Sequence, residues 1–190
     1  LEASWQYDIN SSLKAGRYKL ESGFTKLTFS SGADVLIEGP ADFEIVNNMH
    51  IILTDGKVVA DVSPSAHGFK IDTLNSNTID LGTKFAVATD KSGATEIHVI
   101  QGLVKSKSKT NKEYVELKKD EALQVNKENF SAKLEADSGK FLTMLPPKKI
   151  SDFKHILWRF DEGKGNTASE ESSGYEEQYQ AHLKSTDNNQ

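Results

Sequence analysis

The stretch Asp80-Leu81-Gly82-Thr83 has the residue types that come closest to a catalytic motif in this chain. A carboxylate beside glycine and threonine could serve hydrolysis in which two aspartates share one proton. However, the order differs from the Asp-Thr-Gly sequence used for that chemistry, and the chain has no second copy. Aspartate can also accept hydrogen bonds from backbone amides two residues on, and glycine adopts positive φ. We therefore expect Asp80 and Thr83 to tie the turn before a strand that contains Phe85.

Other residue types that carry chemistry are scattered along the chain. The five histidines, none two or four residues from another, are His50, His67, His98, His155 and His182. This spacing predicts no metal motif, and each histidine is expected at the surface or bonded locally. There is no cysteine, which removes disulfides, thiolate zinc sites and cysteine nucleophiles.

Two carboxylates, Asp42 and Glu44, share a face because they alternate around Phe43. Such a pair is usually solvent-exposed on a strand. The alternative, that the two carboxylates serve glycoside hydrolysis, is left open. The chain has no nucleophile elbow and no phosphate-binding loop. We predict no catalytic residue, no cofactor and no metal site, and therefore a protein that is not an enzyme.

Charge and hydropathy argue against two further classes of protein, those that bind nucleic acid and those that span a membrane. The net charge of −5 argues against a nucleic-acid partner, since phosphate binding needs a basic face. No apolar run approaches the roughly 18 residues of a membrane helix. The first residues do not read as a signal peptide. We expect either a cytosolic protein or, as the polar residues 185–190 favour, a piece of a longer one.

Short apolar segments separated by turns fill residues 16–104. Residues 26–30 alternate apolar and polar side chains, Gly39-Pro40 is expected to break a strand, and Asp55-Gly56 signals a hairpin. No stretch keeps a helical period. The pattern predicts an all-β fold, with many short antiparallel strands in a compact sandwich or β-helix-like stack.

The rest of the chain changes character. Residues 105–112 are basic and polar, which predicts a solvated hairpin tip or, alternatively, a contact with an anionic surface. More strands are expected at 114–117, 121–125 and 130–134. Two adjacent prolines stiffen the segment that follows. The predicted division is one β domain at 1–145, a linker at 146–155 and the incomplete start of a second domain at 156–190.

The order of the turns resembles the FecR domain. The matching elements are 30–41 with Phe43, 55–59, 66–69, 80–83 with Phe85, and 101–104. The residues that carry the family's structural turns are Gly32, Gly39, Pro40, Gly56, Gly68, Asp80, Gly82, Thr83, Phe85 and Gly102. The version with Glu-Gly-Pro-Ala at 38–41 and Asp-Leu-Gly-Thr at 80–83 looks like the variant found in exported proteins of planctomycete-like bacteria.

This resemblance implies a non-catalytic β domain outside the cytoplasm. Its relatives include membrane-anchored regulators that relay an outer-membrane signal to a cytoplasmic sigma factor. The present chain shows no sigma-binding segment and no membrane helix, so only the β module carries over. The implied partner is a protein at the cell envelope, and the implied location is periplasmic or cell-surface, with an export signal and membrane anchor outside this sequence.

A second resemblance lies near the end of the chain. Residues 157–165, followed by Ser172-Ser173-Gly174, are similar to the start of a laminin-G-like, concanavalin-type lectin domain. It implies the main alternative, a cell-surface protein that binds carbohydrate. The aromatic residues that could offer a sugar-stacking platform are Trp5, Tyr7, Tyr18, Phe24 and Phe29, with core packing as the other expectation for Phe24 and Phe29.

Overall fold

The protein is described by a computed structural model, which covers residues 13–111, 113–126, 130–144, 157–159, 169–170 and 183–185. Its strands are β1 Gly16–Leu20, β2 Phe24–Thr28, β3 Ala33–Asn47, β4 His50–Val62, β5 Lys70–Asp72, β6 Ser76–Asp80, β7 Lys84–Thr89, β8 Thr95–Gln101, β9 Leu103–Ser108, β10 Val115–Lys118, β11 Glu121–Val125, β12 Phe130–Glu135, β13 Leu157–Arg159, β14 Ser169–Glu170 and β15 Leu183–Ser185. Two 3₁₀ turns, η1 Pro64–Ala66 and η2 Ser138–Lys140, complete the elements. The all-β expectation is confirmed.

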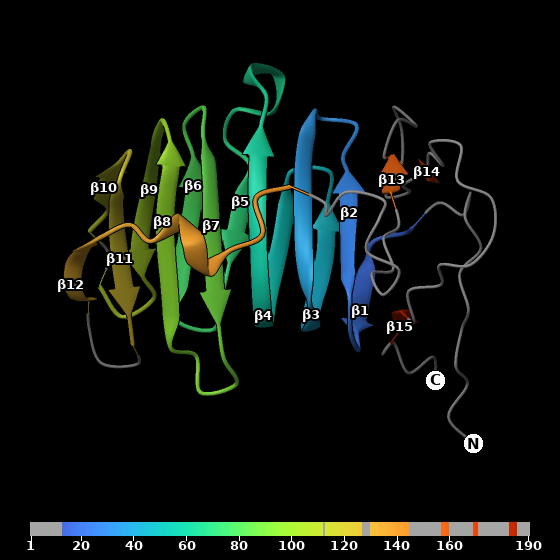
Figure 1. The fold of residues 1–190 in the computed structure, drawn as a ribbon, viewed down its shortest axis with the longest axis horizontal. Coiled ribbons are helices and arrows are strands. Elements are labelled where there is room, and N and C mark those ends of the chain that lie inside the picture. Colours follow the sequence, from blue (N-terminus) through green and yellow to red (C-terminus); the bar gives the residue numbers. More distant parts are fainter. Residues whose placement is uncertain are drawn as a thin grey trace.

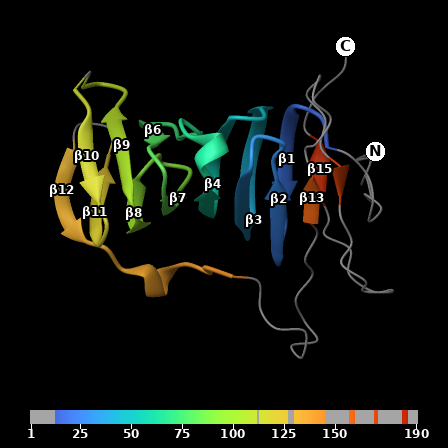
Figure 2. The same cartoon turned by 90° about the horizontal axis from the view of Figure 1, so that it is seen from above.

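The strands form two layers that enclose one core (Figures 1 and 2). The front layer in Figure 1 contains β2, the first half of β3, the second half of β4, β7, β8, β11 and β12. The back layer contains β1, the other halves of β3 and β4, β5, β6, β9 and β10. Side chains alternate between the core and the outside along β1, β2, β6 and β9, as on any pleated sheet.

The long pair β3–β4 belongs to both layers because it folds over on itself. Its register runs from Ala33↔Val62 to Glu38↔Lys57, breaks, and resumes from Asp42↔Asp55 to Asn47↔His50. Strands that change sheets in this way need a bend or a bulge at the corner. The corner is formed by Gly39-Pro40 on β3 and by Gly56 on β4.

Two predictions at this corner were wrong. The strand continues through Gly39-Pro40, whose peptide bond is cis, and Asp55-Gly56 lies inside β4 rather than in a hairpin turn. Gly56 has φ +112°, and a Cβ there would lie 2.7 Å from the Cβ of Ala41. The local turn signals are therefore used to bend a paired ribbon instead of ending its strands.

After this ribbon the chain alternates between the layers. It crosses over at η1, at Leu81–Thr83, at Gly102 and at Lys119–Asp120, and these crossings stack along the upper edge in Figure 1. We call this stack the crossing edge. Asp120 is the non-glycine residue with positive φ among the described residues, at +66°.

The expected basic loop at 105–112 was wrong in part. Residues 105–108 belong to β9, which pairs with β6 and β10. Val104, Ser106 and Ser108 are buried, whereas Lys105 and Lys107 alternate with them and point away from the core. A lysine at every second position is thus compatible with a strand that has one buried face.

The core changes character along the stack. Near β3, β4 and β7 it is filled by large side chains, among them Phe29, Phe43, Phe69 and Phe85. Toward β6 and β9 it contains buried hydroxyls that bond to each other, such as Thr73 Oγ1 to Thr95 Oγ1 at 2.9 Å. Buried hydroxyl groups need such partners because an unsatisfied one is costly.

The predicted linker at 146–155 lies outside the described residues, as does most of the segment 156–190. Within that segment, β13 pairs in parallel with β2, and β15 pairs antiparallel with β1. The domain boundaries stay a prediction. Among the described residues no helix is long and apolar enough to cross a membrane.

Candidate interaction surface

Asp80 ties the turn between β6 and β7. Its Oδ2 accepts a hydrogen bond from the Gly82 amide at 2.8 Å, and the Thr83 hydroxyl donates to its Oδ1. Burial raises the pKa of Asp80, while backbone hydrogen bonds from Gly82, Thr83 and Gly68 act in the opposite direction. Both carboxylate oxygens are used by the turn, so the arrangement is that of a structural tie.

The other family-type turn residues divide into two groups. Gly32, Gly68, Gly82 and Gly102 lie at the crossing edge, where the Gly32 carbonyl accepts from the Ser63 amide and the Gly68 amide donates to the Asp80 carbonyl. A Cβ on Gly102 would lie 2.3 Å from the Gly82 carbonyl oxygen, so neighbouring crossings touch through their backbones.

Gly39, Pro40 and Gly56 form the second group, at the corner of the β3–β4 ribbon on the opposite edge. Phe85 is fully buried on the inner face of β7. The structure therefore assigns packing and turn positions to these residues, and it does not gather them into one surface site.

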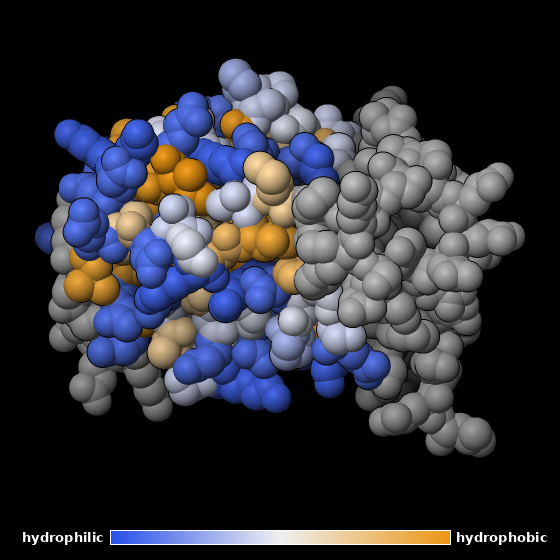
Figure 3. Space-filling view, viewed as in Figure 1, coloured by the Kyte–Doolittle hydropathy of each residue, from blue (hydrophilic) through white to orange (hydrophobic). Residues whose placement is uncertain are grey.

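A different region offers an exposed surface with mixed chemistry. After β12, residues Ala136–Met144 run across the outer face of the front layer (Figure 1), and we call this segment the strap. Phe141 of the strap packs on Leu36, Val59 and Ala86 in a second apolar cluster, apart from the main core. We call these four residues the outer cluster. Figure 3 shows apolar surface among hydrophilic side chains on this face.

His98 on β8 anchors the start of the strap. Its ring is 3% exposed, its Nδ1 accepts a hydrogen bond from the Asp137 amide at 3.1 Å, and its Nε2 lies 3.1 Å from Glu96 Oε2. The ring also contacts Phe141, with centroids 4.9 Å apart. The strap is thus held by a histidine that accepts a hydrogen bond from the Asp137 amide and packs against the Phe141 ring.

Charged groups add two contacts along the strap. Lys140 Nζ lies 3.2 Å from Glu96 Oε2, and Lys57 Nζ donates to the Lys140 carbonyl at 3.3 Å. The hydrogen bond from His98, together with Lys140, lowers the pKa of Glu96. These contacts are partly exposed and each is expected to contribute little alone.

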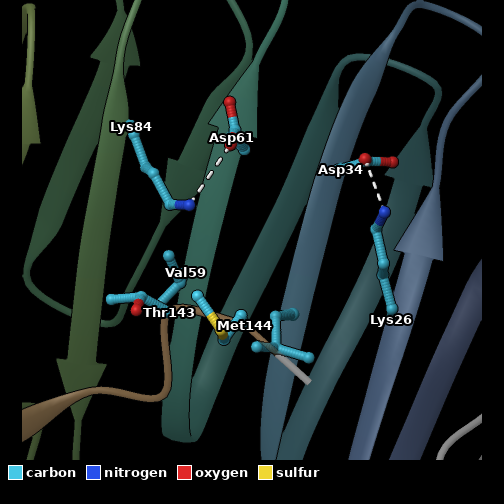
Figure 4. A pocket seen from close by; sticks show the side chains of 8 residues that line it. Lys26, Asp34, Val59, Asp61, Lys84, Thr143 and Met144 are labelled. Atoms are coloured by element: carbon cyan, nitrogen blue, oxygen red, sulfur yellow. Dashed lines mark ion pairs between the residues drawn. The ribbon is translucent and has the colours of Figure 1, made fainter. Parts of the chain in front are cut away.

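A hollow of about 270 Å³ opens where the strap reaches Met144. Leu36, Val59 and Met144 provide its apolar surface, and two ion pairs frame it: Lys26–Asp34 at 2.7 Å and Lys84–Asp61 at 3.3 Å (Figure 4). The Met144 side chain is 72% exposed. Because the charges are paired, the hollow offers an apolar contact with a polar rim, as protein interfaces do.

Metal chemistry finds no support in the described ranges, where no three His, Asp or Glu side chains gather closely enough to hold an ion. His50 is half-buried and bonds Asp72 at 3.1 Å. Burial acts to raise the pKa of Asp72, but hydrogen bonds from His50 and Asn77 outweigh it and lower that pKa. His67 lies at the surface, and His155 and His182 lie outside the described residues.

The aromatic platform expected from sequence is not formed by Tyr18 and Phe29. Tyr18 is 5% exposed and stacks on Phe43, and Phe29 is 1% exposed and packs edge-on against Phe69. Phe24 is half-buried, and Trp5 and Tyr7 lie outside the described residues. Burial of two of the five rings removes them from any sugar contact.

Sequence reasoning missed the strap contacts, although one signal pointed toward them. Residues 35–37 and 85–87 are uninterrupted apolar runs, and such runs are typical of strands covered on both faces. A cover for the outer face was therefore implied. The spacing Glu96–His98 also places both side chains on one face, but nothing local indicates that Asp137 and Lys140 meet them.

The described residues form a two-layered all-β domain, and comparison with known proteins supports this fold. Residues 24–105 match the family model described as FecR protein. The FecR resemblance is thereby confirmed for that segment, which is less than half of the 190-residue chain. The lectin-like resemblance and the planctomycete-like variant stay predictions.

Two crystal structures of a proposed anti-sigma factor from Parabacteroides distasonis ATCC 8503 share the fold. The 1.65 Å structure has a TM-score of 0.56 and 16% identity, over 65% of this chain and 61% of that chain. The 2.50 Å structure has a TM-score of 0.53 and 16% identity, over 69% and 62%. The similarity thus spans less than two thirds of the length of that protein. No curated protein gave a significant match.

Proposed function

We propose that this protein is a non-catalytic interaction module in signal sensing or regulation at the cell envelope, and that it contacts a protein partner through the hollow beside Met144. The main support is the FecR match over 24–105 together with a hollow of mixed apolar and charged lining that is open at the outer face of the front layer. The likeness to a proposed anti-sigma factor fits a regulatory role.

The chemistry of the hollow indicates what the partner supplies. Leu36, Val59 and Met144 favour an apolar side chain, and the two framing ion pairs favour polar groups around it. The paired charges give no preference for a strongly charged ligand. Nothing in the described residues favours the carbohydrate-binding alternative, which depends on the lectin-like segment.

A photo-crosslinking amino acid at Met144 tests this proposal in cells that produce the full-length protein. The matched control places the same group at Lys70, an exposed residue on the outer face of the back layer. We expect one protein to be captured from position 144 and not from position 70. Equal capture from both positions, or none from 144, would contradict the assignment of the hollow.

The location outside the cytoplasm is part of the proposal and has its own test. Residues 1–190 contain no cysteine, so Lys70→Cys introduces one thiol into this part of the protein at an exposed position, and the unsubstituted protein is the control for any other thiol. A small maleimide that does not cross the inner membrane is expected to label this thiol in intact cells. Labelling that requires cell lysis would place the domain in the cytoplasm instead.

A further inference from the structure

His98 differs from the other described histidines because it lies under another segment of the chain. It is 3% exposed on the outer face of β8, and the strap covers it. Asp137 contacts it from 39 positions away in the sequence. A buried titratable ring between a sheet and a covering segment is suited to a switch, since one proton changes what the ring can bond.

The two contacts of the ring define its protonation state. A backbone amide can only donate, so the Asp137 amide requires a lone pair on Nδ1. Nε2 then carries the hydrogen and donates to Glu96 Oε2. The strap is therefore bound by the neutral imidazole in one specified tautomer.

A second proton on the ring affects only one of these contacts. Nε2 can still donate to Glu96, so the bond on the β8 side survives. Nδ1 becomes a donor that faces the donating amide of Asp137, and the strap loses its acceptor in a buried position. Protonation thus removes the hydrogen bond to the strap and leaves the hydrogen bond to Glu96 on β8 in place.

The surrounding charges come from β8 and from the strap itself. Glu96 accepts from Nε2, Lys140 pairs with Glu96, and the Asp137 carboxylate accepts from the Gly139 amide. The flanking strands place Ala86 and Ala122 opposite His98, and β11 adds the neutral amide of Gln124, which bonds Glu96. An added charge on His98 also competes with Lys140 for Glu96.

We propose that His98 is a proton-operated clip for the strap: in the neutral state it holds Asp137, and in the protonated state it releases the strap and uncovers the outer cluster. Release exposes Leu36, Val59 and Ala86, which Phe141 otherwise covers. Because Leu36 and Val59 also line the hollow and Met144 belongs to the strap, release of the strap changes the hollow as well. The meaning of this change for partner binding rests on the proposed function, whereas release of the strap does not.

Hydrogen exchange of the strap amides in the full chain, without any partner, tests the clip. Protection factors are compared at about pH 7.5 and about pH 5.5, within the range where histidine can change its charge. We expect the protection of the Asp137 and Phe141 amides to fall roughly tenfold or more, as loss of one buried hydrogen bond predicts. The Val87 amide in β7 is the internal reference and is expected to keep its protection.

Two variants identify the group that titrates. H98Q keeps a donor and an acceptor but cannot gain a proton, so its strap is expected to exchange equally at both pH values. E96Q removes the neighbouring carboxylate and is expected to retain the pH dependence. A dependence that persists in H98Q, or disappears only in E96Q, would overturn the proposal.

Nitrogen NMR of the wild-type His98 ring keeps the test decisive if H98Q does not fold. Protonation of Nδ1 and loss of strap protection are expected at the same pH. Protonation with an unchanged strap would also overturn the clip. No partner is present in these measurements. A negative result would therefore overturn the clip without affecting the crosslinking test at Met144, and a negative crosslinking result would not affect the clip.

Discussion

The crossing edge and the strap both border the front layer, but different groups hold them in place. At the crossing edge, successive turns contact each other through their backbones, and glycine is required where Gly102 meets the Gly82 carbonyl. The strap is held mainly by side chains, namely His98, Lys140 and Phe141. Backbone packing of this kind cannot open without unfolding, whereas a side-chain cover can detach alone.

The substitution Gly102→Ala is expected to have the largest effect. Gly102 has φ +85°, and its new Cβ would lie 2.3 Å from a backbone oxygen, so strain and overpacking add to about 2–5 kcal/mol of lost stability. Thermal and denaturant unfolding measure it. Gly82→Ala is the matched control, with φ +93° and open space around its Cβ, and is expected to cost about 1–2 kcal/mol. Equal losses would mean that the two crossings do not touch.

The substitution Phe141→Ala tests whether side-chain packing holds the strap. Phe141 is 7% exposed in a small cluster near the surface, so we expect a loss of about 1–3 kcal/mol, below the cost in a deep core. Local exchange of the strap amides should rise more than exchange in β7. Met144→Ala, at a side chain that is 72% exposed, is the control and should change stability by less than about 0.5 kcal/mol. A uniform rise in exchange across both layers would show that the strap is not a separate unit.

The substitution Glu96→Gln tests the charges under the strap through the pH dependence of stability. The pKa of Glu96 in the folded protein is lowered from 4.5, chiefly by the hydrogen bond from His98. The carboxylate therefore stabilises the fold above pH 4.5, and this contribution is lost as the pH falls through the folded-state pKa. Denaturant titrations should show a less stable variant at neutral pH and a difference that shrinks in acid. A difference independent of pH would assign the effect to packing.

The substitution Lys140→Ala should have the smallest effect. The lysine side chain is 50% exposed, and exposed ion pairs contribute about 0.2–1 kcal/mol, so the loss should lie at the low end of that range. Unfolding at low and high salt measures it, since salt weakens such pairs. A larger, salt-independent loss would indicate that the Lys140 backbone contact with Lys57 had also been disturbed.

Much of the local structure could be predicted from sequence because it depends on neighbouring residues. The Asp80–Thr83 turn and the all-β fold are examples, since both follow from turn chemistry and alternation. The bend at Gly39-Pro40 and Gly56 could not be predicted, because the same residues would end a strand in a simple hairpin. What they do depends on whether the ribbon folds over.

The candidate surface was even harder to predict from the sequence. His98 and Asp137 are 39 residues apart, and Glu96 and Lys140 are 44 residues apart. No local pattern specifies such pairs, because they meet only after β11 and β12 have brought the strap back over β8.

The sequence by itself determined the all-β pattern and the turn at Asp80–Thr83, since alternation and turn chemistry act within a few residues. Only the tertiary structure decided that Gly32, Gly68, Gly82 and Gly102 lie along one edge, that the β3–β4 ribbon belongs to two layers, and that a strap covers His98. Those features arise from contacts between distant segments, and burial of apolar surface selects them collectively.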